Sequence, residues 1–230
     1  MTDTRRTALL AGLLYLLTFV ASIPALPLLA PVLDDPLFVQ SPGSAPGVVA
    51  GGLLDLINAA ACVGTAVVLY PIVRRWGEAG ALGFVTSRVL EAAIIALGVI
   101  SLLAVVSLRL DGSGGGQEVA VARALVAVRD QTFLLGPGLM SAVNALLLGR
   151  LMLRSRLVPR LIPALGLVGA PLQLASVLAT MFGVNDQVSV ASAIAVVPIF
   201  CWELSLGLWL AIRGFADAPA GVAPVLEPAR

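Results

Sequence analysis

The chain contains no histidine and no lysine, and only 12% of its 230 residues are charged. Without histidine it can form neither an HExxH zinc site nor a histidine-dependent catalytic triad. All 14 basic residues are arginine, and 13 acidic residues leave a formal net charge of only +1. This balance gives no case for a nucleic-acid partner, which is bound through a surplus of positive charge. We therefore expect no metal ion, no cofactor and no nucleic acid.

Cysteine is also scarce, because the chain has only Cys62 and Cys201, and both lie inside apolar runs. A disulfide framework needs more cysteines in an exposed, oxidising setting, so these two are expected to be small buried side chains. The segment Gly112–Gly116 lacks the Lys-Ser/Thr ending of a phosphate-binding loop and is expected to be a flexible turn.

Apolar residues, in contrast, are abundant at 59% of the chain, whereas an average soluble domain has about 45–50%. A soluble fold of this size could not cover so many apolar side chains, but a bilayer can solvate them. Six runs are long enough to cross about 30 Å of hydrocarbon as helices. They lie near 7–30, 48–72, 80–108, 131–153, 160–183 and 189–213. The sequence thus predicts an all-α integral membrane six-helix bundle, a single domain at 1–215, and a disordered tail at 216–230.

The arginines predict how the bundle is oriented. With the N-terminus inside, ten arginines fall on inner segments and only Arg109, Arg123 and Arg129 on outer ones, which satisfies the positive-inside rule. Both termini are therefore expected in the cytoplasm. Arginine, alanine, glycine and proline have GC-rich codons, so the composition favours the plasma membrane of a bacterium, with membrane lipid as its surroundings. The alternative is that the first run is a cleaved signal peptide, but its length and the spans that follow favour a retained helix.

Two connecting segments carry structural predictions of their own. The proline-rich segment 31–47 is expected to be an irregular outer loop. The segment 118–130 is mostly apolar between its charged ends, which is typical of a helix lying at the outer interface and leading into the fourth span.

The most informative residues are the charged ones inside the apolar runs, namely Arg88, Glu91 and Glu203. A charge at the bilayer centre costs about 2.5–3.5 kcal/mol even on insertion scales. Such groups persist only if the protein satisfies them internally, so they indicate a polar interior and, by default, a functional site. Counting residues places both glutamates near the midplane, with Arg88 about one turn nearer the cytoplasm.

Helical spacing gathers further polar side chains onto faces. Asp55, Asn58 and Cys62 share one face of the second span, and Asp130 and Asn144 share one face of the fourth. If these faces meet, they outline a cavity that opens to the outside and is closed below by Arg88. The residues predicted to bind a ligand are Arg88, Glu91, Glu203, Asp55, Asn58, Asn144 and Asp130.

The charge count leaves two alternatives for this interior. Arg88 can neutralise either Glu91 or Glu203, and the second carboxylate must then be protonated, bind a cation or meet a cationic ligand. Alternatively, Arg88 bridges both carboxylates as an internal staple with no ligand at all.

Four motifs give the chain a family resemblance. They are Arg88-x-x-Glu91, Phe133-Leu-Leu-Gly-Pro-Gly138, Ser155-Arg-Leu-Val-Pro-Arg160 and Glu203-Leu-Ser-Leu-Gly207-Leu-Trp-Leu210. With them the chain resembles the bacterial membrane family called domain of unknown function 4386, over nearly all of its length except the tail. The resemblance implies a compact helical membrane protein, and it carries no activity and no catalytic residues.

Three functions remain open at this stage. The leading interpretation is a protein that binds or transports a small or lipid-like molecule in its polar intramembrane cavity. The second is an intramembrane enzyme that uses Glu91 and Glu203 as acid and base on a lipid-like substrate. The third is a non-catalytic scaffold subunit whose charges only hold helices together.

Overall fold

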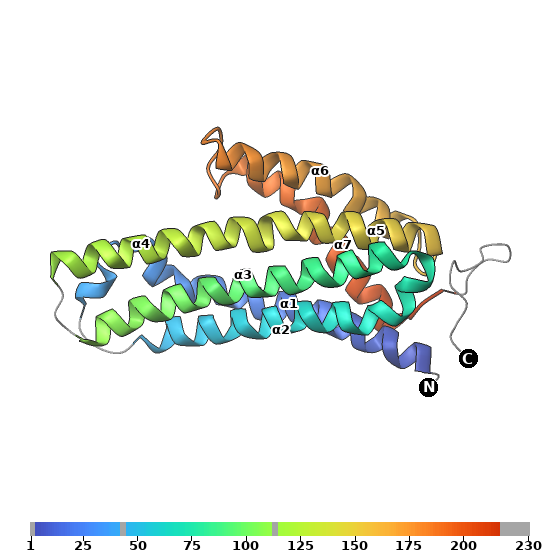
Figure 1. Ribbon diagram of the computed structural model, residues 1–230, viewed down its shortest axis with the longest axis horizontal. Coiled ribbons are helices and arrows are strands. Elements are labelled where there is room, and N and C mark those ends of the chain that lie inside the picture. The colour runs from blue at the N-terminus through green and yellow to red at the C-terminus, as the bar shows by residue number, and fades with distance from the viewer. Residues whose placement is uncertain (1–2, 42–44, 112–114, 217–230) are drawn as a thin grey trace.

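The computed structural model describes residues 3–41, 45–111 and 115–216, and all regular structure within these ranges is helical. Six of its helical segments are long and apolar enough to cross a membrane, and they run back and forth along one axis (Figure 1). The chain is thus a multi-pass membrane protein, and the prediction of an all-α six-helix bundle is confirmed. The predicted disordered tail lies almost wholly outside the described residues.

Seven α-helices build the six spans. Their bounds are α1 Asp3–Asp34, α2 Pro46–Val73, α3 Glu78–Asp111, α4 Gly116–Phe133, α5 Ser141–Ser155, α6 Leu161–Met181 and α7 Val190–Ile212. Short 3₁₀ turns follow α1 at Phe38–Gln40 and α2 at Arg74–Trp76.

The fourth span is much longer than the sequence predicts. A π-helical segment, Leu134–Met140, joins α4 to α5, so that Gly116–Ser155 forms one continuous rod alongside α3 (Figure 1). The prediction of a helix lying at the outer interface over 118–130 was wrong, because Val119 and Ala122 are buried in the bundle. Pro137 lies in the π segment, where a widened turn accommodates a residue that has no N–H to donate.

The helices pack as a closed ring in which α1 contacts both α2 and α7, and α3 contacts α2, α4 and α5. The helix α6 lies between α5 and α7. At 1.5 Å per residue, α1 and α3 are about 48 and 51 Å long, whereas α6 and α7 are only about 32 and 35 Å. The far ends of α1 to α4 therefore extend beyond the α6–α7 hairpin (Figure 1).

This extension has a small core of its own, which explains why the predicted outer loop at 31–47 is partly ordered. The helix α1 continues to Asp34, and the 3₁₀ turn after it buries Phe38 and Val39. These two side chains pack with Leu102 and Val105 of α3. Burial of apolar area on this turn thus overrides the irregular backbone that its prolines favour.

Glycines allow α7 to lie directly against its neighbours. A Cβ at Gly12 of α1 would lie 2.7 Å from the carbonyl oxygen of Gly207 of α7. A Cβ at Gly166 of α6 would lie 2.8 Å from the Trp202 ring. Close backbone approach through small residues is a general means of helix association in membranes. Here it brings α7 near enough for Glu203 to reach α3.

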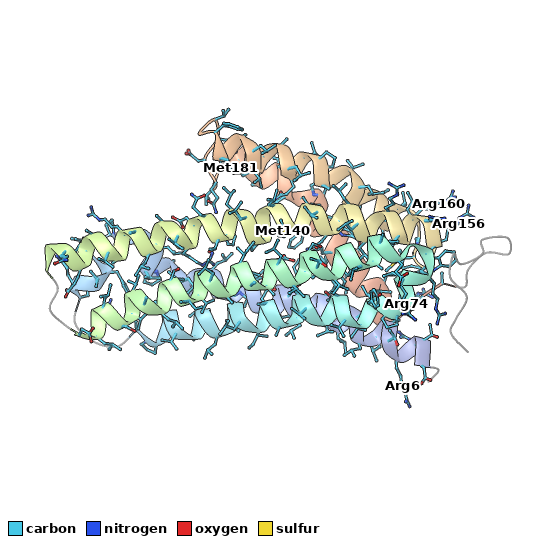
Figure 2. The ribbon with its side chains drawn as sticks, viewed as in Figure 1. Arg6, Arg74, Met140, Arg156, Arg160 and Met181 are labelled. Carbon is cyan, nitrogen blue, oxygen red and sulfur yellow. The ribbon has the colours of Figure 1, made fainter. Side chains whose placement is uncertain are left out.

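Arginines gather at the end of the bundle where the N-terminus lies, as the positions of Arg6, Arg74, Arg156 and Arg160 show (Figure 2). Arg5 contributes a specific contact there, because its Nη1 donates to the carbonyl of Leu210 at 3.0 Å and its Nη2 to that of Ala211 at 2.8 Å. These are carbonyls of the last turn of α7, which lack partners within their own helix.

Candidate functional site

Arg88 is the centre of the site and joins two carboxylates from different helices. Its Nη1 donates to Oε2 of Glu91 at 3.0 Å, one turn further along α3. Its Nη2 donates to Oε1 of Glu203 on α7 at 2.8 Å. Arg88 is only 2% exposed and Glu91 only 4% exposed, so both charges are removed from lipid and solvent. The predicted meeting of these three groups is therefore present, with one guanidinium bonded to both glutamates.

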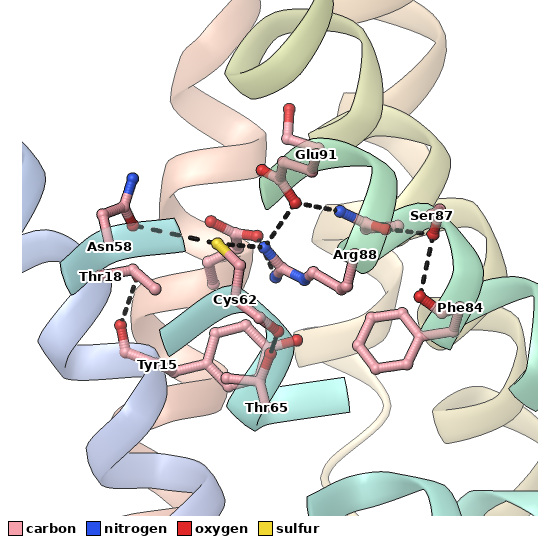
Figure 3. Close-up of polar contacts among 12 residues, drawn as sticks. Tyr15, Thr18, Asn58, Cys62, Thr65, Phe84, Ser87, Arg88 and Glu91 are labelled. Carbon is pink, nitrogen blue, oxygen red and sulfur yellow. Dashed lines mark hydrogen bonds and ion pairs between the residues drawn. The ribbon is translucent and has the colours of Figure 1, made fainter. Parts of the chain in front are cut away.

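Amide and thiol groups extend this cluster across the bundle (Figure 3). The Nδ2 of Asn144, on α5, donates to Oε2 of Glu91 at 2.7 Å, and its Oδ1 contacts the Ser87 hydroxyl. On the other side, Nη1 of Arg88 lies 3.5 Å from Sγ of Cys62 on α2. Four helices thus hold the charges in one arrangement, which limits how far any one of them can turn.

Aromatic rings support the guanidinium from the side away from the carboxylates. The centre of the Arg88 guanidinium lies 5.3 Å from the Tyr15 ring centroid and 5.8 Å from that of Phe84. Rings at such distances attract a cation through their quadrupole. Tyr15 and Phe84 are at most 1% exposed, so this floor is closed by packed side chains.

A second buried ion pair lies nearer the end of the bundle where α1 to α4 extend beyond the α6–α7 hairpin. The Nη2 of Arg129 on α4 donates to Oδ2 of Asp55 on α2 at 3.0 Å. Arg129 passes close to α3, where a Cβ at Gly98 would lie 2.9 Å from its Cδ. The Phe133 ring centroid is 5.2 Å from the guanidinium.

Arg129 is the residue that sequence reasoning missed, because it was assigned to the outer interface and left out of the predicted site. A signal was available in the spacing of its helix. Val119, Ala122, Arg129 and Thr132 follow one another at intervals of three, seven and three residues, which place them on one helix face, and all four are buried. Because Val119 and Ala122 make this helix face apolar at one end, the spacing predicts that Arg129 points into the bundle.

The two ion pairs border one cavity of about 190 Å³. Its polar lining consists mainly of Asp55, Asn58, Arg88, Glu91, Arg129 and Glu203. Its apolar lining includes Phe19, Ile23, Leu26, Leu29, Ile95 and Phe133. The space therefore has the Arg88 cluster at its inner end, the Asp55–Arg129 pair farther out, and apolar walls.

Five of the seven predicted ligand-binding residues line this cavity, namely Asp55, Asn58, Arg88, Glu91 and Glu203. Two do not. Asn144 lies behind Glu91 and holds it by a hydrogen bond. Asp130 borders a separate hollow with Asp35 and Arg123.

The lining carries an excess of negative charge, with three carboxylates against two guanidinium groups. Glu91, Glu203 and Asp55 each accept hydrogen bonds at one oxygen only from the described part of the chain. All three residues line the cavity, and the second oxygen of each carboxylate accepts no hydrogen bond from the described residues. Within residues 3–41, 45–111 and 115–216, no group of three or more acidic, cysteine or histidine side chains converges closely enough to hold a metal ion.

The comparison with protein families gives a match over residues 10–214 to the model described as domain of unknown function (DUF4386). The chain belongs to this family. The matched region contains both ion pairs and every residue that lines the cavity. No curated protein and no solved structure matches the chain. Membership in DUF4386, a domain of unknown function, leaves the activity to be argued from the site.

Proposed function

We propose that this DUF4386 protein binds or transports a small or lipid-like molecule in the cavity between its two buried ion pairs. The observation that carries the proposal is that Arg88, Glu91 and Glu203 line an open space. The protein would do so in the bacterial plasma membrane with both termini in the cytoplasm. The arginine-rich end of the bundle supports that orientation through the positive-inside rule.

The competing function is a scaffold in which the charges only join helices. The bridge from Arg88 to both glutamates favours this alternative, because it ties α3 to α7. A bridge with a purely structural role, however, is most favourable when side chains pack densely around it. Buried ion pairs stabilise a protein only weakly unless every charged group has its hydrogen-bond partners. Instead the Glu203 side chain keeps 16% of its surface exposed and borders the cavity. Binding accounts for both the charges and the space, whereas a scaffold accounts only for the charges.

The test is Glu203→Gln, which removes one charge and keeps the size of the side chain. Glu78→Gln is the matched control, because Glu78 is an exposed carboxylate at the start of α3. Both variants and the wild type are purified in mild detergent, checked for folding by size-exclusion chromatography and thermal unfolding, and extracted for mass spectrometry of retained small molecules and lipids.

We expect the wild type and Glu78→Gln to retain the same molecule and folded Glu203→Gln to lose it by about tenfold or more. If folded Glu203→Gln retains everything that the wild type retains, the scaffold function is correct and the proposal fails. A chemically altered product that accumulates only with the wild type would instead support the intramembrane enzyme.

A further inference from the structure

We infer that the cavity receives the positively charged headgroup of a membrane amphiphile, an amine or a quaternary ammonium, which enters sideways from the bilayer between α1 and α4. This inference rests on the proposed binding function and names the class of ligand and its route. Three properties of the cavity support it: its volume, the chemistry of its mouth and its charge.

The volume suits a headgroup and excludes a whole amphiphile. Sites that enclose a complete drug-sized molecule have about 300–1,000 Å³, whereas this cavity has about 190 Å³. About six water molecules occupy the same volume in the liquid. A larger ligand must therefore leave part of itself outside the mouth.

The mouth is apolar and lies within the spans. Ile23 and Leu26 of α1 line the cavity and are also 52% and 53% exposed, so they form part of its rim. Phe133, at the end of α4, lines it too and is 37% exposed. Exposed apolar side chains at this depth face hydrocarbon, so an alkyl chain leaving the mouth would lie among acyl chains. Ile23 is about 30 Å along α1 from Asp3, which places the mouth in the outer half of the membrane.

The charge at the inner end selects a cation. Both Nη groups of Arg88 already donate to carboxylates, so an anion approaching them would meet Glu91 and Glu203, and three carboxylates line the cavity against two guanidinium groups. The second oxygen of each glutamate accepts no hydrogen bond from the described residues and can accept one from an ammonium group. An uncompensated negative charge in such a site is expensive, and a bound cation would neutralise it. Phe19 also lines the cavity, and aromatic rings favour quaternary ammonium groups.

Native mass spectrometry in a neutral detergent tests the ligand class with three compounds, and the two dodecyl compounds are kept below their critical micelle concentrations. These are dodecyltrimethylammonium, dodecyl phosphate, which has the opposite charge, and tetramethylammonium, which has no chain. We expect one dodecyltrimethylammonium per protein, bound at least tenfold more tightly than either of the others. Glu203→Gln should weaken its binding about tenfold, and the exposed control Glu78→Gln should leave it unchanged.

The route is tested by Ser22→Trp, because Ser22 lines the cavity on α1 and an indole there would obstruct the mouth. Leu13→Trp is the matched control, since Leu13 is 51% exposed on the same helix and does not border the cavity. We expect Ser22→Trp to weaken dodecyltrimethylammonium binding at least fivefold and Leu13→Trp to leave it unchanged. Equal binding by folded Ser22→Trp overturns the lateral route.

The outcomes separate this inference from the proposed function. Tighter binding of dodecyl phosphate, equally tight binding of tetramethylammonium, or no binding of any of the three to folded wild type overturns the ligand class. So does binding that Glu203→Gln does not alter. In each case the proposed function still stands if Glu203→Gln loses the molecule that copurifies with the wild type.

Discussion

At the residue scale, the arrangement around Arg88 follows from the energetics of charge in a medium of low dielectric constant. An isolated ionised group inside the bilayer is strongly unfavourable, and a single partner leaves some of its hydrogen-bonding capacity unused. The five donors of a guanidinium allow two carboxylates to be bonded at once. Glu91 and Glu203 use this property, at 3.0 and 2.8 Å. A lysine at position 88 would present one point charge and could not bond both in the same fixed geometry.

Replacing Arg88 by leucine should destabilise the protein by about 3–5 kcal/mol, because it leaves two buried carboxylates without their cation. The triple variant Arg88→Leu, Glu91→Gln and Glu203→Gln should be more stable than Arg88→Leu alone, since the unpaired charges are removed as well. Equilibrium unfolding in mixed micelles measures both. A triple variant no more stable than Arg88→Leu would contradict this account of the cluster.

Sequence reasoning found Arg88, Glu91 and Glu203 because they interrupt apolar runs, where their energetic cost is plain. It left the choice between one and two paired carboxylates open, and the structure has both paired. It missed the role of Arg129, which lies near the predicted start of a span. A charge at the end of a span has a low energetic cost, so nothing marked this residue as unusual. The position of a residue along a span thus controls how much its sequence context reveals.

At the scale of elements, α7 is held in place by shape as much as by charge. Gly12 and Gly207 allow α1 and α7 to touch along their backbones, and Gly169 allows α6 to approach Pro198 of α7. These contacts set the depth and rotation at which Glu203 meets Arg88. The π segment at Leu134–Met140 has a similar effect on the fourth span, because its extra residue per turn changes the rotation of Arg129 relative to Asn144.

Substitution of Gly12 by alanine should lower stability by about 1–3 kcal/mol, because the added methyl group would overlap the backbone of α7. Gly47→Ala is the control, since the nearest atom to a Cβ there is 3.9 Å away, and its effect should stay within about 0.5 kcal/mol. Thermal unfolding in detergent measures both changes. Equal stabilities for the two variants would show that the α1–α7 contact can relax without loss.

At the scale of the whole molecule, the bundle is asymmetric from one end to the other. One end carries Arg6, Arg74, Arg156 and Arg160, and the other is an extension of α1 to α4 beyond the α6–α7 hairpin (Figures 1 and 2). The cavity lies between them, below the extension and above the packed aromatic floor formed by Tyr15 and Phe84. The positive-inside rule predicts that the arginine-rich end faces the cytoplasm and the extension faces outward.

Thiol labelling of intact cells tests this orientation. Cys201 is exposed, so the expectation that both cysteines are buried was wrong for this residue, and Cys201→Ala removes the exposed thiol. In that background, Ser41→Cys and Ala79→Cys place single exposed thiols at opposite ends of the bundle. We expect a membrane-impermeant maleimide to label Ser41→Cys in intact cells and Ala79→Cys only after permeabilisation. The reverse pattern would mean that the termini lie outside.

The sequence by itself determined the number of spans, their approximate positions and the presence of a charged interior. These properties depend on local hydropathy and on the cost of placing a charge in hydrocarbon, and both can be evaluated residue by residue. It did not determine that Arg129 pairs with Asp55, that segment 118–130 continues the fourth span, or that Asp130 lies apart from the cavity. Only the tertiary structure decided these points, because they depend on how each helix is rotated against its neighbours. That rotation is set by close packing between residues far apart in the chain.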